Sequence, residues 1–120
     1  MYHQRMKPGL QRVRLGAALA TALVVLLGGS AWTAQPPYVV SQKDRAFHPG
    51  TLTIQHGDTI RIVNDDGDLL HHAYVESDTF NFDSGDQLPG SKTDVVFSVP
   101  GTFNVLCGIH PKMKLVVQVK

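Results

Sequence analysis

The sequence TFNVLCGIHPKMKLVVQV (residues 102–119) joins two β-type runs through a short loop that carries three residue types able to bind a metal. In the first run, alternation of side chains places Phe103 and Cys107 on the same face, so the thiol at the strand's end should point inward. His110 and Met113 follow Cys107 on one short loop, close enough to fold back around a single centre. The stretch therefore predicts a pair of strands with a ligand site at their connection.

The remainder of residues 35–120 continues the β pattern, and helix signals are absent from it. The expected strands are 38–42, 51–55, 59–63, 72–76, 93–99, 102–107 and 114–119. Because clusters of Gly, Pro, Asp and Asn separate these runs, about seven to eight short strands should form an all-β, antiparallel sandwich or barrel. The long connection between the fourth and fifth strands contains Phe80, Phe82 and Leu88, which we expect to pack against the sandwich.

Residues 1–34 differ from the rest, with a basic start, an apolar run over 17–27 and a small-residue end. This order is typical of a secretory signal peptide of the Sec type, with a signal helix cleaved after Ala31 or Ala34. Such a leader would export a single domain of residues 35–120 to the periplasm. The alternative is an uncleaved N-terminal membrane anchor, because the uncharged stretch is about long enough to span a bilayer.

The formal net charge changes sign when residues 1–34 are excluded. The whole chain carries a formal charge of +1, whereas residues 35–120 hold seven Lys or Arg against ten Asp or Glu, a formal charge of −3. This balance gives nucleic-acid binding no electrostatic basis. Six loop acids form either a docking surface for a cationic partner or a solvated face. They are Asp65, Asp66, Asp68, Asp78, Asp83 and Asp86.

The residue types around the only cysteine favour copper. Trigonal coordination by two histidines and one cysteine, with a weak axial methionine, is the ligand set of blue-copper electron-transfer sites. Cys107, His110 and Met113 supply three of these ligands, and the pair His71-His72 is the obvious source of the second histidine. Methionine suits structural zinc poorly, and the sequence has no C-x-x-C-H haem motif.

Alternation also bears on the choice between the two neighbouring histidines. If Ala73 and Val75 line the core, His71 lies on their inward face and His72 points outward. We therefore expect His71 to be the ligand. The alternative for the whole site is a packed core cysteine, Cys107, near a histidine and a methionine that are merely exposed.

At this point the sequence resembles the cupredoxins, most closely the small amicyanin-like and plastocyanin-like bacterial proteins. The spacing of Cys107, His110 and Met113 is similar to the short amicyanin loop. Upstream, Asn64-Asp65 followed by His71-His72-Ala73-Tyr74 is similar to the family's pattern of an asparagine followed by H-N-V.

The resemblance covers residues 38–120 and implies the Greek-key cupredoxin fold with one type 1 copper. The implied copper ligands are His71, Cys107, His110 and Met113, and the residues implied to support them are His72, Asn64, Gly108 and Pro111. One position departs from the family, because His72 stands where asparagine is usual. Its backbone N–H can still reach the thiolate, but Gly108 has no side chain to receive a side-chain hydrogen bond.

The activity implied by the resemblance is one-electron transfer between proteins in the periplasm, without enzymatic turnover. The expected partners are transient redox proteins such as a c-type cytochrome, or a dehydrogenase or oxidase, bound by a monomer that is free of the membrane once the leader is cleaved. We expect electrons to leave through His110, inside an apolar patch. The alternative is a periplasmic copper carrier or buffer that uses the same ligands. A catalytic copper enzyme would need further histidines, and only His48 and His56 remain besides His72.

Overall fold

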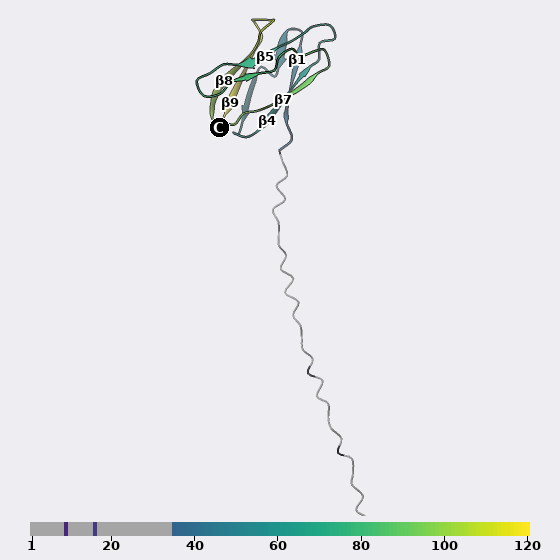
Figure 1. The fold of residues 1–120 in the computed structure, drawn as a ribbon, viewed down its shortest axis with the longest axis vertical. Coiled ribbons are helices and arrows are strands. Elements are labelled where there is room, and N and C mark those ends of the chain that lie inside the picture. The colour runs from purple at the N-terminus through teal and green to yellow at the C-terminus, as the bar shows by residue number, and fades with distance from the viewer. Residues whose placement is uncertain (1–8, 10–15, 17–34) are drawn as a thin grey trace, which may run out of the picture. The chain divides into compact units, whose positions relative to one another are not determined.

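The computed structural model describes residues 35–120 together with Gly9 and Gly16, and the expected signal helix lies outside these residues. Nine strands form two sheets, with the orders β2-β1-β4-β7 and β3-β9-β8-β5-β6 (Figure 1). The strands are β1 (Tyr38–Lys43), β2 (Ala46–His48), β3 (Thr51–Ile54), β4 (Thr59–Asn64), β5 (Ala73–Val75), β6 (Phe82–Asp83), β7 (Lys92–Val96), β8 (Gly101–Cys107) and β9 (Lys114–Val119). The expected all-β sandwich is confirmed.

The strand pairing is mixed, whereas we expected it to be antiparallel throughout. β1 pairs with β4 and β3 pairs with β9 in parallel, and the other pairs are antiparallel. The parallel pairs arise because the chain passes from β1 and β2 to β3 in the other sheet before it returns in β4. Parallel partners need such a crossover, which local turn signals do not reveal.

Two strands were not expected from the sequence, and three expected strands, β3, β5 and β7, are shorter than predicted. β2 and β6 have only three and two residues, too few to display an alternating pattern. β5 starts at Ala73, because His71 forms an isolated bridge with Gln87 instead. β7 ends at Val96, and the next residue, Phe97, bonds to the segment before β4, where its N–H donates to the Asp58 carbonyl at 3.1 Å.

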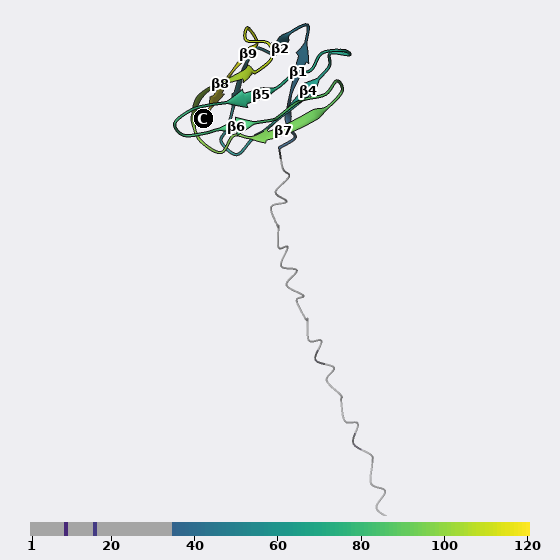
Figure 2. The same ribbon diagram turned by 45° about the horizontal axis from the view of Figure 1, so that its top comes forward.

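The two sheets are drawn as ribbons in Figure 2. The core lies between them, and most strands contribute alternate side chains to it. Three aromatic rings meet in it, with ring centroids of Phe80 and Phe97 separated by 5.0 Å and those of Phe80 and Phe103 by 5.5 Å. The expectation that the long connection packs on the sandwich is therefore confirmed for Phe80, and also for Phe82. It is wrong for Leu88, which is 65% exposed because the preceding Gln87 takes the interior position.

Three strands bring the candidate site residues to one end of the sandwich. β8 ends at Cys107, and Ala73 at the start of β5 is its direct cross-strand partner. β4 ends at Asn64, from which a loop leads to His71. In the part of the chain that the structure describes, no helix is long and apolar enough to cross a membrane.

We expect the aromatic cluster to account for a large share of the stability. Replacing Phe97, which is fully buried, with alanine should lower the free energy of unfolding by about 3–5 kcal/mol through lost burial and a residual cavity. The neighbouring Val96 is 51% exposed, and its replacement by alanine should cost at most about 1 kcal/mol. Urea unfolding of the copper-free protein measures both, and equal losses would contradict the assignment of Phe97 to the core.

Candidate metal centre

The structure brings together three of the residues that the sequence singles out. A ligand atom from each of His71, Cys107 and His110 lies within 4.8 Å of the other two. The Cys107 Sγ is 3.8 Å from the His71 Nδ1 and also 3.8 Å from the His110 Nδ1. Two imidazole nitrogens therefore face one sulfur from different segments of the chain. Their role as metal ligands remains a prediction.

The three residues differ in exposure. His71 and Cys107 are buried, at 0% and 2% exposed, whereas His110 is half-buried on the loop after β8. The pKa of His110 is lowered, mainly by burial and further by its neighbours His71 and Arg45. Lowering the pKa favours the neutral imidazole, the form with a free lone pair for a metal.

Met113 closes the loop. Its backbone N–H donates to the His110 carbonyl at 2.9 Å, which turns the chain back toward β9. The side chain is buried and belongs to the core, so the thioether is held in the interior rather than in solvent. The loop thus folds back as its length predicts, and axial coordination by Met113 stays a prediction.

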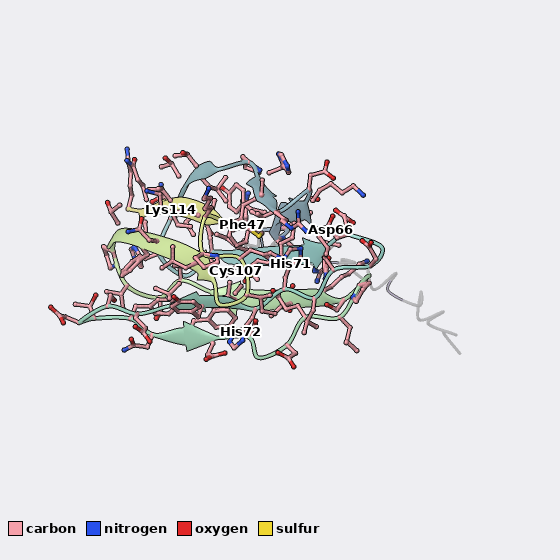
Figure 3. The ribbon with its side chains drawn as sticks, turned by 90° about the horizontal axis from the view of Figure 1, so that it is seen from above. Phe47, Asp66, His71, His72, Cys107 and Lys114 are labelled. Carbon is pink, nitrogen blue, oxygen red and sulfur yellow. The ribbon has the colours of Figure 1, made fainter. Side chains whose placement is uncertain are left out.

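His71 and His72 point to different partners, as their alternation predicts (Figure 3). The His71 ring lies with Cys107 and His110, whereas the His72 Nε2 is 2.5 Å from a carboxylate oxygen of Asp83. The expected backbone contact at His72 is present, because its N–H donates to the Cys107 Sγ at 3.4 Å. This position therefore offers the thiolate a hydrogen bond although the side chain is not asparagine.

The contact between Gly108 and His72 differs from the side-chain hydrogen bond that the family pattern implies at this position. Its N–H donates to the His72 carbonyl at 2.9 Å, and the His72 ring lies over it, 3.6 Å from where a Cβ would be. The imidazole thus covers the residue after the cysteine by packing, without a side-chain hydrogen bond. Pro111 is exposed and lines a surface hollow with His110.

Asp66 is a functional residue that the sequence did not single out correctly. We placed it among the acids of a docking surface or solvated face, but it is buried and its Oδ2 is 2.6 Å from the His71 Nε2. Burial raises the pKa of this carboxyl, but hydrogen bonds from His71 and the Asp44 N–H outweigh burial, so the pKa is lowered. Nothing in the sequence distinguishes it from Asp65 and Asp68, which are exposed.

The contact with Asp66 selects the tautomer of His71. Since a carboxylate accepts hydrogen bonds, the Nε2 carries a proton, so in the neutral imidazole the lone pair lies on the Nδ1, which is 3.8 Å from the Cys107 Sγ. A carboxylate or carbonyl at the outer nitrogen of a metal-bound histidine is the usual arrangement in metalloproteins. The neutral tautomer that this contact selects therefore presents the Nδ1 as a ligand.

Asn64 braces the loop that carries Asp66. Its Nδ2 donates to the carbonyls of Leu69 at 2.8 Å and Gln87 at 2.9 Å, and its Oδ1 accepts the N–H of Asp66 at 3.0 Å. The side chain is fully buried and all of these bonds are within the 64–87 region. The supporting role that the resemblance implies for Asn64 is consistent with these contacts.

Gln87 also supports the site and was missed. Its N–H and carbonyl exchange two hydrogen bonds with His71, at 2.7 and 3.1 Å. Its side-chain Oε1 accepts from Gln42 at 2.7 Å and from the N–H of Ala73 at 3.1 Å. One signal was available, because alternation in the first strand places Gln42 on the same buried face as Val40.

The donor set fits a type 1 copper. One thiolate and two imidazole lone pairs lie close together, with a buried thioether on the same loop, and this mixture suits both copper oxidation states. The outer nitrogen of one histidine and the sulfur itself each have a hydrogen-bond partner, as a tuned metal site requires.

Comparisons with known proteins agree with this fold. A solved copper-containing nitrite reductase from Thermus scotoductus SA-01 is 30% identical with a TM-score of 0.65, over 70% of this chain and 22% of that chain. A Cu(I) form of an amicyanin variant is 20% identical with a TM-score of 0.66, over 76% of this chain and 89% of that chain. A reduced form of another amicyanin variant gives the same identity, coverage and TM-score. Among curated proteins, the search finds no match.

The share of each chain that a match covers determines whether the match shows the fold alone or the family. The chain spans about a fifth of the nitrite reductase, and the likeness to amicyanin shows the fold. A family model described as a cupredoxin-like domain matches residues 16–117. Since this match covers most of the sequence, the chain belongs to the cupredoxin-like family.

Proposed function

We propose that this cupredoxin binds one copper and carries single electrons between redox proteins. The observation that carries the proposal is the convergence of the His71 Nδ1, the Cys107 Sγ and the His110 Nδ1 at one end of the sandwich. These residues would hold the metal, with Met113 as the weak axial ligand. Copper would supply the one-electron couple, and the protein supplies donors that are already in place.

The surroundings of the donors suit electron transfer better than catalysis. Among the described residues, His71, Cys107 and Met113 are buried, so their side of the site offers a substrate no open position. Only the His110 side approaches the surface, where Ile109, Pro111, Arg45 and Lys112 line an apolar hollow around it. We infer that electrons pass through this surface around His110, which we call the His110 edge, during brief encounters with redox partners. Small interfaces are usual for such encounters.

We propose the location and the partners on the basis of the sequence. The basic and apolar leader supports export to the periplasm by a Sec-type signal peptide, or anchorage there if the leader is not cleaved. A c-type cytochrome, or a dehydrogenase or oxidase, is the kind of partner we propose, bound transiently by a monomer. The charge of −3 on residues 35–120 argues against nucleic acid as a partner.

The visible spectrum of the purified protein after addition of Cu(II) tests the central claim. We expect an intense blue band from the thiolate–copper bond, which bleaches with ascorbate and returns with an oxidant. A folded protein that stays colourless would contradict coordination by Cys107. A protein that takes up Cu(I) tightly, releases it to an acceptor protein and exchanges electrons slowly would support the carrier or buffer alternative.

The adjacent histidines provide a matched pair of variants. His71→Ala should remove a buried ligand and weaken Cu(II) binding together with the blue band, whereas His72→Ala should keep the band because its backbone N–H to the sulfur remains. Cys107→Ser should abolish the band. Copper titrations followed at the blue maximum measure all three. Loss of the band in His72→Ala but not in His71→Ala would reverse the assignment.

Electron self-exchange tests the role of the His110 edge without a known partner. Ile109→Lys should slow self-exchange by about tenfold, since it removes apolar contact and adds a charge where Arg45 and Lys112 already repel a second copy. Val96→Lys is the control, because Val96 is also exposed, at 51% against 42% for Ile109, but lies beside Thr59, at the opposite end of β4 from Asn64. NMR line broadening in mixtures of Cu(I) and Cu(II) protein measures the rate. Equal slowing in both variants would contradict exit through this edge.

A further inference from the structure

The contact between Asp66 and His71 favours one tautomer of His71, but the function proposed so far gives no role to the buried negative charge of Asp66. We propose that the Asp66 carboxylate positions His71 as a ligand and lowers the reduction potential of the copper by placing a negative charge behind its buried histidine. This inference rests on the proposed function. It assigns to Asp66 a tuning role that acts through His71 rather than by direct contact with the metal.

The geometry leaves the carboxylate little freedom. Its Oδ2 is 2.6 Å from the His71 Nε2, and the two side chains are 5% and 0% exposed. Its Oδ1 accepts the Asp44 N–H at 3.0 Å, so both oxygens are occupied. The Asp66 N–H in turn donates to the Asn64 Oδ1. Figure 3 shows Asp66 next to His71, on the side away from Cys107. A carboxylate fixed in this way holds the imidazole in one orientation and one tautomer.

Among the described residues, no lysine or arginine forms an ion pair with Asp66, whose ion-pair contact is with His71. The positive charge of Lys43 also acts on the Asp66 carboxylate, but His71 is the group that the carboxylate contacts directly. Its hydrogen bond to the imidazole raises the donor strength of the Nδ1 on the opposite side of the ring. In a buried region, a fixed anion stabilises the more highly charged ion, which is Cu(II), more than Cu(I).

Asp65 provides a matched control for this effect. It is the preceding residue, it carries the same charge, and it is exposed, with its carboxylate hydrogen-bonded to the Ser41 hydroxyl instead of to a histidine. Asp65→Asn and Asp66→Asn therefore change the net charge equally, within one residue of each other. Only the second variant removes the anion that contacts His71.

Redox titration of the copper-loaded full chain, followed at the blue band, measures the effect. In Asp66→Asn we expect the Cu(II)/Cu(I) ratio at a given applied potential to fall at least about tenfold. This fall is equivalent to a rise of about 59 mV in the reduction potential of the copper, for one electron. In Asp65→Asn we expect a change below about twofold, because solvent screens an exposed charge. Equal shifts in the two variants, or a lower potential in Asp66→Asn, would overturn the proposal.

A second measurement does not depend on a variant that folds. In the diamagnetic Cu(I) form of the unaltered protein, long-range ¹H–¹⁵N NMR should show the His71 Nε2 protonated, with a proton that exchanges slowly because Asp66 holds it. An unprotonated Nε2, or a proton that exchanges as fast as one in contact with solvent, would overturn the positioning role. The variant Asp66→Asn can lose copper, because its amide has one oxygen and can replace only one of the two carboxylate oxygens that accept from His71 and Asp44. In that case the NMR result on the unaltered protein tests the positioning role of Asp66.

The outcomes separate this inference from the proposed function. A blue, reversible wild-type protein with equal potentials in Asp65→Asn and Asp66→Asn would refute the tuning role alone. A wild-type protein that binds copper without a blue band would refute the proposed function, and the tuning role with it.

Discussion

The pairing of Ala73 with Cys107 between β5 and β8 determines which histidine faces the thiol. Side chains alternate along a strand, so a shift of one residue in this register would exchange the positions of His71 and His72. The hydrogen bond from the His72 N–H to the sulfur belongs to the same register, as does the bond from the Gly108 N–H to the His72 carbonyl. One cross-strand pair thus sets the donor geometry and the contacts of the sulfur together.

The register alone does not hold His71, because the chain leaves regular β structure there. Its backbone instead exchanges two hydrogen bonds with Gln87, whose side chain reaches Gln42 in the other sheet. Buried polar groups without partners are costly, so a nearly complete set of bonds among Asn64, Asp66 and Gln87 makes this arrangement specific. The donors can then stay in place in either copper oxidation state.

The sequence predicted those parts of the site that depend on local pattern. The strand–loop–strand unit around Cys107 and the inward direction of His71 both follow from alternation over a few residues. The sequence did not reveal Asp66, because several acids share its loop and no periodicity separates the buried one from the exposed ones. It also did not reveal the parallel pairs β1–β4 and β3–β9, which join segments distant in sequence, or the exposure of Leu88, which depends on Gln87 occupying the interior.

The two histidines of the site lie in opposite electrostatic surroundings. His71 is buried against a carboxylate, whereas His110 lies near the surface beside Arg45 and Lys112. In the function proposed above, an anion behind the buried histidine would favour the oxidised metal, and cations around the half-buried histidine would favour an acidic partner surface. Because the anion is shielded from solvent and the cations are not, added salt should weaken the second influence far more than the first. In the proposed function, the interior would thus set the potential of the copper, whereas the surface around His110 would control encounter with partners.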